Sequence, residues 1–246
     1  TRYNEAPELA GMVESGDLPS VDERLPINPL VLSPLNEIGS YGGTVNTFYG
    51  WEGHLLECMY GHSAVRWIDD GLDIAPGICE SWATNADNSE WTLVFRKGLK
   101  WSDGEPVTVD DVMFWWNDMV LNPDHSDAPP DFGTSASGTL VEFVKEDDYT
   151  LTLRYDTPAP LTLKRLAMWV NAGIGPRWIV PAHYVQQFHP KYSDDYSDFE
   201  EFDVMQNNKT NPEMPVLNSW MLTENEPTLH QGSERNTHYY AVHPEG

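Results

Sequence analysis

Hydrophobic and polar residues alternate most clearly over residues 91–96, where Trp, Leu and Phe take every second position. This period of two predicts a β-strand with one apolar face. An Asp-Gly turn follows at residues 103–104, and Thr108 stands three residues before Asp111. That spacing predicts a capping box, in which each side chain accepts a hydrogen bond from a backbone amide at a helix start.

The capped helix is expected over residues 110–120, because its apolar residues recur every three or four positions along one face. These residues are Val112, Trp115, Trp116, Met119 and Val120, while Asp110, Asp111, Asn117 and Asp118 lie mostly off that face. Aromatic residues at strand or helix spacing usually pack in cores. We therefore interpret Trp82, Trp91, Trp101 and Trp115 as structural residues.

Further strands and helices are expected to alternate along the chain. The patterns predict a strand at 44–49, a helix at 53–60 and a hairpin within 144–155 that turns at Asp147-Asp148. They also predict helices at 161–169 and 181–188, an exposed loop at 192–203 and a strand-like stretch at 237–242. Alternation of this kind predicts an α/β fold with a mixed sheet.

Proline spacing sets the first 40 residues apart, with prolines at positions 7, 19, 26, 29 and 34. We expect an extended arm over residues 1–40, with one short helix at 8–15 where Leu9, Met12 and Val13 share a face. A lobe is expected over residues 41–246. Its first part, 41–155, alternates strands and helices, and its second part, 156–246, is more helical.

The composition is strongly acidic and narrows the range of partners. Fourteen Lys and Arg face 39 Asp and Glu, which gives a formal net charge of -25. Such a charge argues against binding to phosphate backbones or anionic lipid headgroups, so nucleic-acid binding is not expected. The sequence contains no run of about twenty apolar residues, so no transmembrane helix is predicted. The first residue is Thr1, which fits removal of a signal peptide or lipoprotein leader.

Two cysteines, Cys58 and Cys79, allow one disulfide. Both stand among apolar residues, which favours buried free thiols. The pairing stays open, because a bridge needs Cβ atoms within about 4.5 Å of each other.

Four consecutive motifs resemble the signature of the family 5 extracellular solute-binding proteins, the peptide-binding and nickel-binding subunits of ABC importers. They occupy residues 76–82, 91–98, 101–106 and 107–116. Cys79 stands where this family usually has Ala. The resemblance continues at 41–45, 144–155, 179–183 and Arg235-Asn236, where Thr237 replaces the usual Pro.

This resemblance implies a mixed-sheet lobe of a two-lobed, type II periplasmic-binding-protein-like fold. The resemblance also implies a protein about twice as long as this chain. The second lobe is therefore expected to be largely absent from the chain, which we interpret as a fragment. The resemblance also implies a receptor that captures a peptide or similar small solute and delivers it to a membrane ABC permease. It would be periplasmic or extracellular, with a lipid anchor at its N-terminus as an open alternative.

The expected solute site is the loop between the first strand and the first helix, since ligands of open α/β sheets bind beyond the carboxyl ends of strands. Its glycines permit close approach, its aromatic rings can cover apolar or peptide surface, and its carboxylate can pair with an amine. The candidate binding residues are Phe48, Tyr49, Trp51, Glu52 and His54.

Catalytic and metal sites find little support in the sequence. No Gly-x-Ser-x-Gly, His-Glu-x-x-His, Walker or dinucleotide glycine motif occurs. We expect no cofactor, no metal and no enzymatic activity. Two other classes stay open. Ten Trp would suit a secreted carbohydrate-active hydrolase, although carboxylates adjacent in sequence, such as Asp69-Asp70, usually point apart and do not make a glycosidase pair. The chain could also be a cell-surface structural or assembly module.

Overall fold

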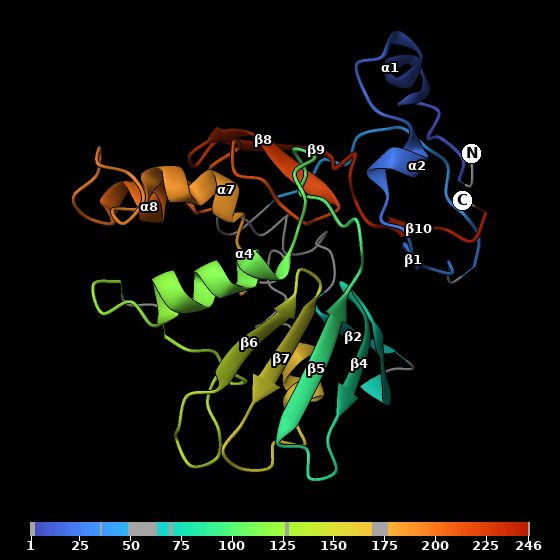
Figure 1. The fold of residues 1–246 in the computed structure, drawn as a ribbon. Helices are drawn as coiled ribbons and strands as arrows, with labels where there is room; N and C mark the ends of the chain where they lie inside the picture. Colours follow the sequence, from blue (N-terminus) through green and yellow to red (C-terminus); the bar gives the residue numbers. More distant parts are fainter. Residues whose placement is uncertain are drawn as a thin grey trace.

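The computed structural model describes residues 3–34, 36–48, 63–68, 71–125, 128–168 and 177–245 (Figure 1). Its largest sheet has the strand order β4-β5-β7-β6. The strands are β4 (Cys79–Thr84), β5 (Glu90–Phe95), β7 (Thr150–Arg154) and β6 (Glu142–Asp147), and each neighbouring pair is antiparallel. The expected strand and hairpin are therefore confirmed.

Strand β5 buries one face because its side chains alternate. Trp91, Leu93 and Phe95 are buried, and the residues between them are half-buried. Before β4, the backbone at Gly77 passes so close to Ser63 that a Cβ would overlap the Ser63 carbonyl oxygen. Cys79, at the start of β4, is a buried free thiol, as expected. Cys58 lies outside the described residues.

Helix α4 (Val109–Phe114) crosses over this sheet (Figure 1) and begins at the predicted capping box. The Thr108 amide donates to Asp111 Oδ2 at 2.9 Å, and the Asp110 amide donates to Thr108 Oγ1 at 3.3 Å. Unlike the single α-helix expected over 110–120, the chain continues as a π-helix, η2 (Trp115–Val120).

The acidic residues Asp111 and Asp118 were expected off the apolar face, and for both that expectation is wrong. Asp111 is 5% exposed and Asp118 is 7% exposed. Each carboxylate is buried because it finds donors across the fold. Asp118 accepts hydrogen bonds from Lys191 and from the Tyr192 hydroxyl. Hydrophobic periodicity alone gives no sign of such long-range partners.

Helices also follow the sheet. α5 (Thr162–Leu166) falls inside the predicted helix at 161–169, and α7 (Ala182–Val185) with the 3₁₀ turn η3 (Gln186–Phe188) confirms the one at 181–188. The exposed loop expected at 192–203 is wrong at its end, where α8 (Glu200–Met205) begins. Phe202 anchors this helix, because it is fully buried against the rings of His189 and Phe114.

The strand expected at 44–49 is also wrong over its described part. Residues 44–48 form no strand, and both Val45 and Phe48 are highly exposed, so no described strand pairs with this stretch. Tyr49 and the helix expected at 53–60 lie outside the described residues. Of the stretch at 237–242, only β10 (Ala241–Val242) is a strand.

The two ends of the chain meet beside the main sheet (Figure 1). β1 (Leu30–Val31) pairs in parallel with β10. The short helices α1 (Ala10–Ser15) and α2 (Val21–Arg24) precede β1, and the helix expected at 8–15 is thus confirmed in its main part. Two separate antiparallel pairs complete the fold: β2 (Val65–Ile68) with β3 (Asp73–Pro76), and β8 (Trp220–Glu226) with β9 (His230–Arg235).

Candidate functional site

The structure describes only one of the five residues expected to bind solute. Phe48 is fully exposed, at 101% of its reference area. Tyr49, Trp51, Glu52 and His54 lie outside the described residues. The loop therefore stays a prediction, although an exposed aromatic ring at its start is compatible with contact to a ligand.

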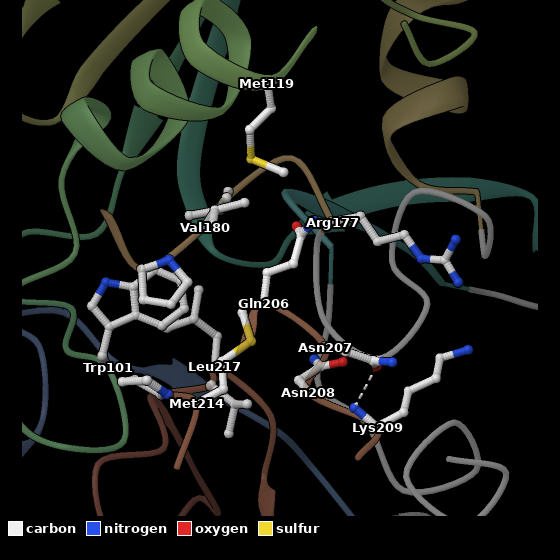
Figure 2. A pocket seen from close by; sticks show the side chains of 14 residues that line it. Trp101, Met119, Arg177, Val180, Gln206, Asn207, Asn208, Lys209, Met214 and Leu217 are labelled. Atoms are coloured by element: carbon white, nitrogen blue, oxygen red, sulfur yellow. Dashed lines mark hydrogen bonds between the residues drawn. The ribbon is translucent and has the colours of Figure 1, made fainter. Parts of the chain in front are cut away.

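A cavity of about 410 Å³ lies between the turn after β5, the end of η2, the segment before α7 and the segment after α8. Its apolar wall is formed mainly by Trp101, Met119, Ile179, Val180, Met214 and Leu217. Trp101 was interpreted as a core residue, and at 2% exposed it is one, but the indole also borders this cavity. Figure 2 shows Met119 and Val180 on one side and Met214 on the opposite side.

The other wall of the cavity is polar and basic. It is formed by Arg177, Gln206, Asn207, Asn208 and Lys209. In Figure 2 the Arg177 and Lys209 side chains extend on the same side of the cavity, across from Trp101. The Lys209 amide donates to Asn207 Oδ1 at 3.1 Å, which fixes the turn between these two residues. An apolar wall facing a basic one suits a ligand with both characters.

The buried carboxylate of Asp111 joins two segments of the apolar wall. Asp111 Oδ1 accepts a hydrogen bond from the Ala182 amide at 3.1 Å, and Oδ2 accepts one from Trp101 Nε1 at 3.4 Å. Burial raises the pKa of Asp111 to about 6, and the bonds from the Thr108 and Ala182 amides oppose the rise. The same residue thus caps α4 and positions Trp101 against the segment that enters α7.

A second pair of contacts fixes the opposite edge of the cavity. The Ser102 amide donates to the Val216 carbonyl at 3.1 Å, and the Val216 amide donates to Ser102 Oγ at 3.0 Å. The turn after β5 and the segment at 214–217, which belongs to no helix or strand, are therefore joined by two reciprocal bonds. The cavity is a built feature of the fold, since contacts far apart in sequence define its walls.

Sequence reasoning missed this cavity, including Arg177, Asn207 and Lys209. One signal was available, because residues 206–209 read Gln-Asn-Asn-Lys in a chain where acidic residues are common. Across the described ranges, no three His, Cys, Asp or Glu side chains gather as a metal site. Among the helices that the structure describes, none is long and apolar enough to cross a membrane.

A family model described as bacterial extracellular solute-binding proteins, family 5, matches residues 73–245. The chain belongs to this family. The match covers the main sheet, both walls of the cavity and the return to β10. The resemblance read from the four signature motifs is thereby confirmed.

Sequence relatives of this family 5 chain are named as binding proteins. It is 28% identical to the periplasmic α-galactoside-binding protein of Rhizobium meliloti over 95% of this chain and 36% of that protein. It is 31% identical to the periplasmic oligopeptide-binding protein OppA of Escherichia coli over 58% of this chain and 25% of that protein. The chain thus spans about a third or less of these relatives' length.

Solved structures give the same fold for the whole chain. An oligopeptide-binding protein OppA matches with a TM-score of 0.86 and 30% identity, over 100% of this chain and 40% of the other. The binding protein MelB of Agrobacterium fabrum, solved with stachyose, matches with a TM-score of 0.78 and 28% identity, over 99% and 39%. The expected fold class, part of a two-lobed mixed α/β binding protein, is confirmed.

Proposed function

We propose that the protein is an extracytoplasmic receptor that captures a peptide or similar small solute and delivers it to an ABC importer. The observation that carries this proposal is the family match over residues 73–245, joined to the whole-chain structural match with an oligopeptide-binding protein. The periplasmic location named for the relatives supports a place outside the cytoplasm. An attached lipid stays an open alternative.

Lobe closure is the proposed mechanism of capture. In two-lobed binding proteins, ligand stabilises a closed arrangement about a hinge. The present lobe would supply the aromatic loop with Phe48, Tyr49, Trp51, Glu52 and His54 as one face of the cleft. Its rings would cover apolar or peptide surface, and the Glu52 carboxylate would pair with a ligand amine.

An α-galactoside is a second candidate solute, and two comparisons favour it. The α-galactoside-binding relative aligns with 95% of this chain, and the structure solved with stachyose matches 99% of it. Aromatic rings in the predicted loop would suit a sugar face as well as a peptide. Solute transport is the proposed function whether the solute is a peptide or an α-galactoside. Evidence that the protein is a secreted hydrolase or an assembly module would contradict it.

The test is isothermal titration of the full-length protein with a short peptide series and with stachyose. Binding of a peptide or of stachyose at micromolar affinity or tighter supports the receptor function. Whichever of the two binds indicates the class of solute. Trp51→Ala should weaken binding at least about tenfold if this ring covers the ligand. A matched control is Trp220→Ala on β8, which should leave affinity unchanged. No binding, or hydrolysis of stachyose, would contradict the proposal.

A further inference from the structure

The cavity between Trp101 and the segment at 206–217 has a charge that sets it apart from the rest of the chain. Asp and Glu outnumber Lys and Arg by 39 to 14 in the sequence. None of the described residues that line the cavity is acidic, however, and two of them, Arg177 and Lys209, are basic. The cavity is therefore a basic concavity in an acidic protein, which favours anionic ligands.

Arg177 differs from the other described arginines in its contacts. Each of the others donates at least one side-chain hydrogen bond; these are Arg24, Arg66, Arg96, Arg154, Arg165 and Arg235. Within the described ranges no hydrogen bond or ion pair involves the guanidinium of Arg177, which is exposed at the edge of the cavity. A guanidinium presents a planar fork of donors that matches a carboxylate with two parallel hydrogen bonds.

The wall opposite Arg177 is apolar, and the cavity is of limited size. Met119, Val180 and Leu217 line the wall across from Arg177, and the volume of about 410 Å³ lies at the lower end of the range for small-molecule sites. Such a space can hold one ring or a short alkyl chain. A carboxylate at Arg177 would leave the apolar part of the ligand against this wall.

From these contacts we propose that the cavity binds a small amphipathic monocarboxylate. The guanidinium of Arg177 pairs with the carboxylate. The apolar part packs against Met119, Val180 and Leu217. This inference goes beyond solute transport, because it assigns a ligand to a cavity whose lining does not include Phe48, the one described residue among those expected to bind solute.

A matched pair of probes tests the proposal on the full-length protein. 3-Phenylpropanoate and 3-phenylpropanamide share their size and ring and differ in charge. We expect the acid to bind and the amide to bind at least about tenfold more weakly, as measured by titration calorimetry. Equal affinity for the two probes, or no binding of the acid, would overturn the proposal.

Two variants assign the discrimination to the guanidinium. Arg177→Gln should abolish the preference for the acid and leave the weak affinity for the amide unchanged. Lys164→Gln removes the same charge from an exposed position on α5, so it should keep the preference. Circular dichroism checks that both variants fold. Retention of the preference in a folded Arg177→Gln variant would also overturn the proposal, whatever the identity of the transported solute.

Discussion

The main sheet with α4 and the region where the chain ends meet are stabilised in different ways. In the sheet region, large apolar side chains pack closely, as in the stacked pair of Trp116 and Phe143, whose ring centroids are 4.1 Å apart. Where the ends meet, β1 and β10 contribute two residues each, and the buried Arg24 supplies much of the linkage. Dense apolar packing makes the first region the stable framework.

The contacts that connect the two ends of the chain are mainly polar, and Arg24 makes several of them. Arg24 Nη1 donates to the Thr237 carbonyl at 2.6 Å, Nε donates to the Pro19 carbonyl at 2.9 Å, and Nη2 pairs with Glu5. One charged side chain thus connects segments more than 200 residues apart. Leu30 and Tyr240 of this region reach the main core, but the polar contacts of Arg24 hold the outer segments, so single substitutions there should open the region locally and leave the sheet folded.

The largest expected effect comes from removing a ring of the sheet region. Trp116→Ala should lower the free energy of unfolding by about 3–5 kcal/mol, because Trp116 is buried and stacked on Phe143. Trp220→Ala on β8 is the matched control, since Trp220 is 38% exposed and should lose below about 1 kcal/mol. Urea unfolding measures both. Similar losses for the two variants would remove the contrast between the regions.

A pH dependence is expected from Asp111, which joins the capped helix to the cavity. The folded-state pKa of about 6 lies above the usual 3.8, so the folded protein holds this proton more tightly than the unfolded chain does. Asp111 therefore contributes on the order of 3 kcal/mol to the free energy of unfolding below about pH 4, and this contribution is lost as pH rises through 6.

Asp111→Asn removes the titrating carboxyl group and should therefore remove this loss of stability with rising pH. The measurement is urea unfolding of wild type and variant between pH 4 and 7, where the difference between the two profiles isolates Asp111 from other carboxylates. We expect the stability of the wild type to fall relative to that of the variant as pH rises. Parallel profiles would show that Asp111 titrates in its ordinary range.

A smaller effect is expected where the termini meet. Arg24→Met should cost about 2 kcal/mol, because two carbonyls and Glu5 lose a charged donor. Hydrogen exchange should accelerate at the Leu30 and Leu32 amides, which bond to Tyr240 and Val242, with no change in β5. Arg235→Met removes a half-exposed ion pair with Glu8 and is the control. Faster exchange throughout the sheet would contradict two separable regions.

The smallest effect concerns the turns of two hairpins. Thr228, between β8 and β9, has a φ of 67°, and Asn88, between β4 and β5, has a φ of 59°. Positive φ is costly for a β-branched residue and tolerated by Asn. Thr228→Gly should therefore stabilise the protein by about 0.5–1 kcal/mol, while Asn88→Gly should change stability by less than about 0.5 kcal/mol. Thermal unfolding measures both variants. A larger gain in stability from Asn88→Gly than from Thr228→Gly would contradict the expectation.

The sheet region could be predicted from sequence because its signals are local. Alternation in β5, the capping box of Thr108 and the Asp147-Asp148 turn each lie within a few residues. Two expectations were wrong: the strand at 44–49, over its described residues 44–48, and the exposed loop up to residue 203. Strand pairing and the burial of Phe202 depend on distant contacts. β8 and β9 have weak alternation and were not predicted.

The cavity was beyond sequence reasoning for the same physical reason. Its walls come from Trp101, Met119, Arg177 and the segment at 206–217, which meet only through bonds such as those of Asp111 and Ser102. The solute loop was predicted from family resemblance and from its position after the strand expected at 44–49. Among its proposed residues only Phe48 is described, so its role stays a prediction.

The central claim is that this family 5 chain is the part of a receptor that captures a small solute. Native mass spectrometry of the full-length protein purified from its source, without added ligand, tests it most directly. We predict a bound peptide or oligosaccharide that is released on activation and restores the original mass when added back. A protein that carries no solute, and gains no mass with peptides or stachyose, would contradict the account.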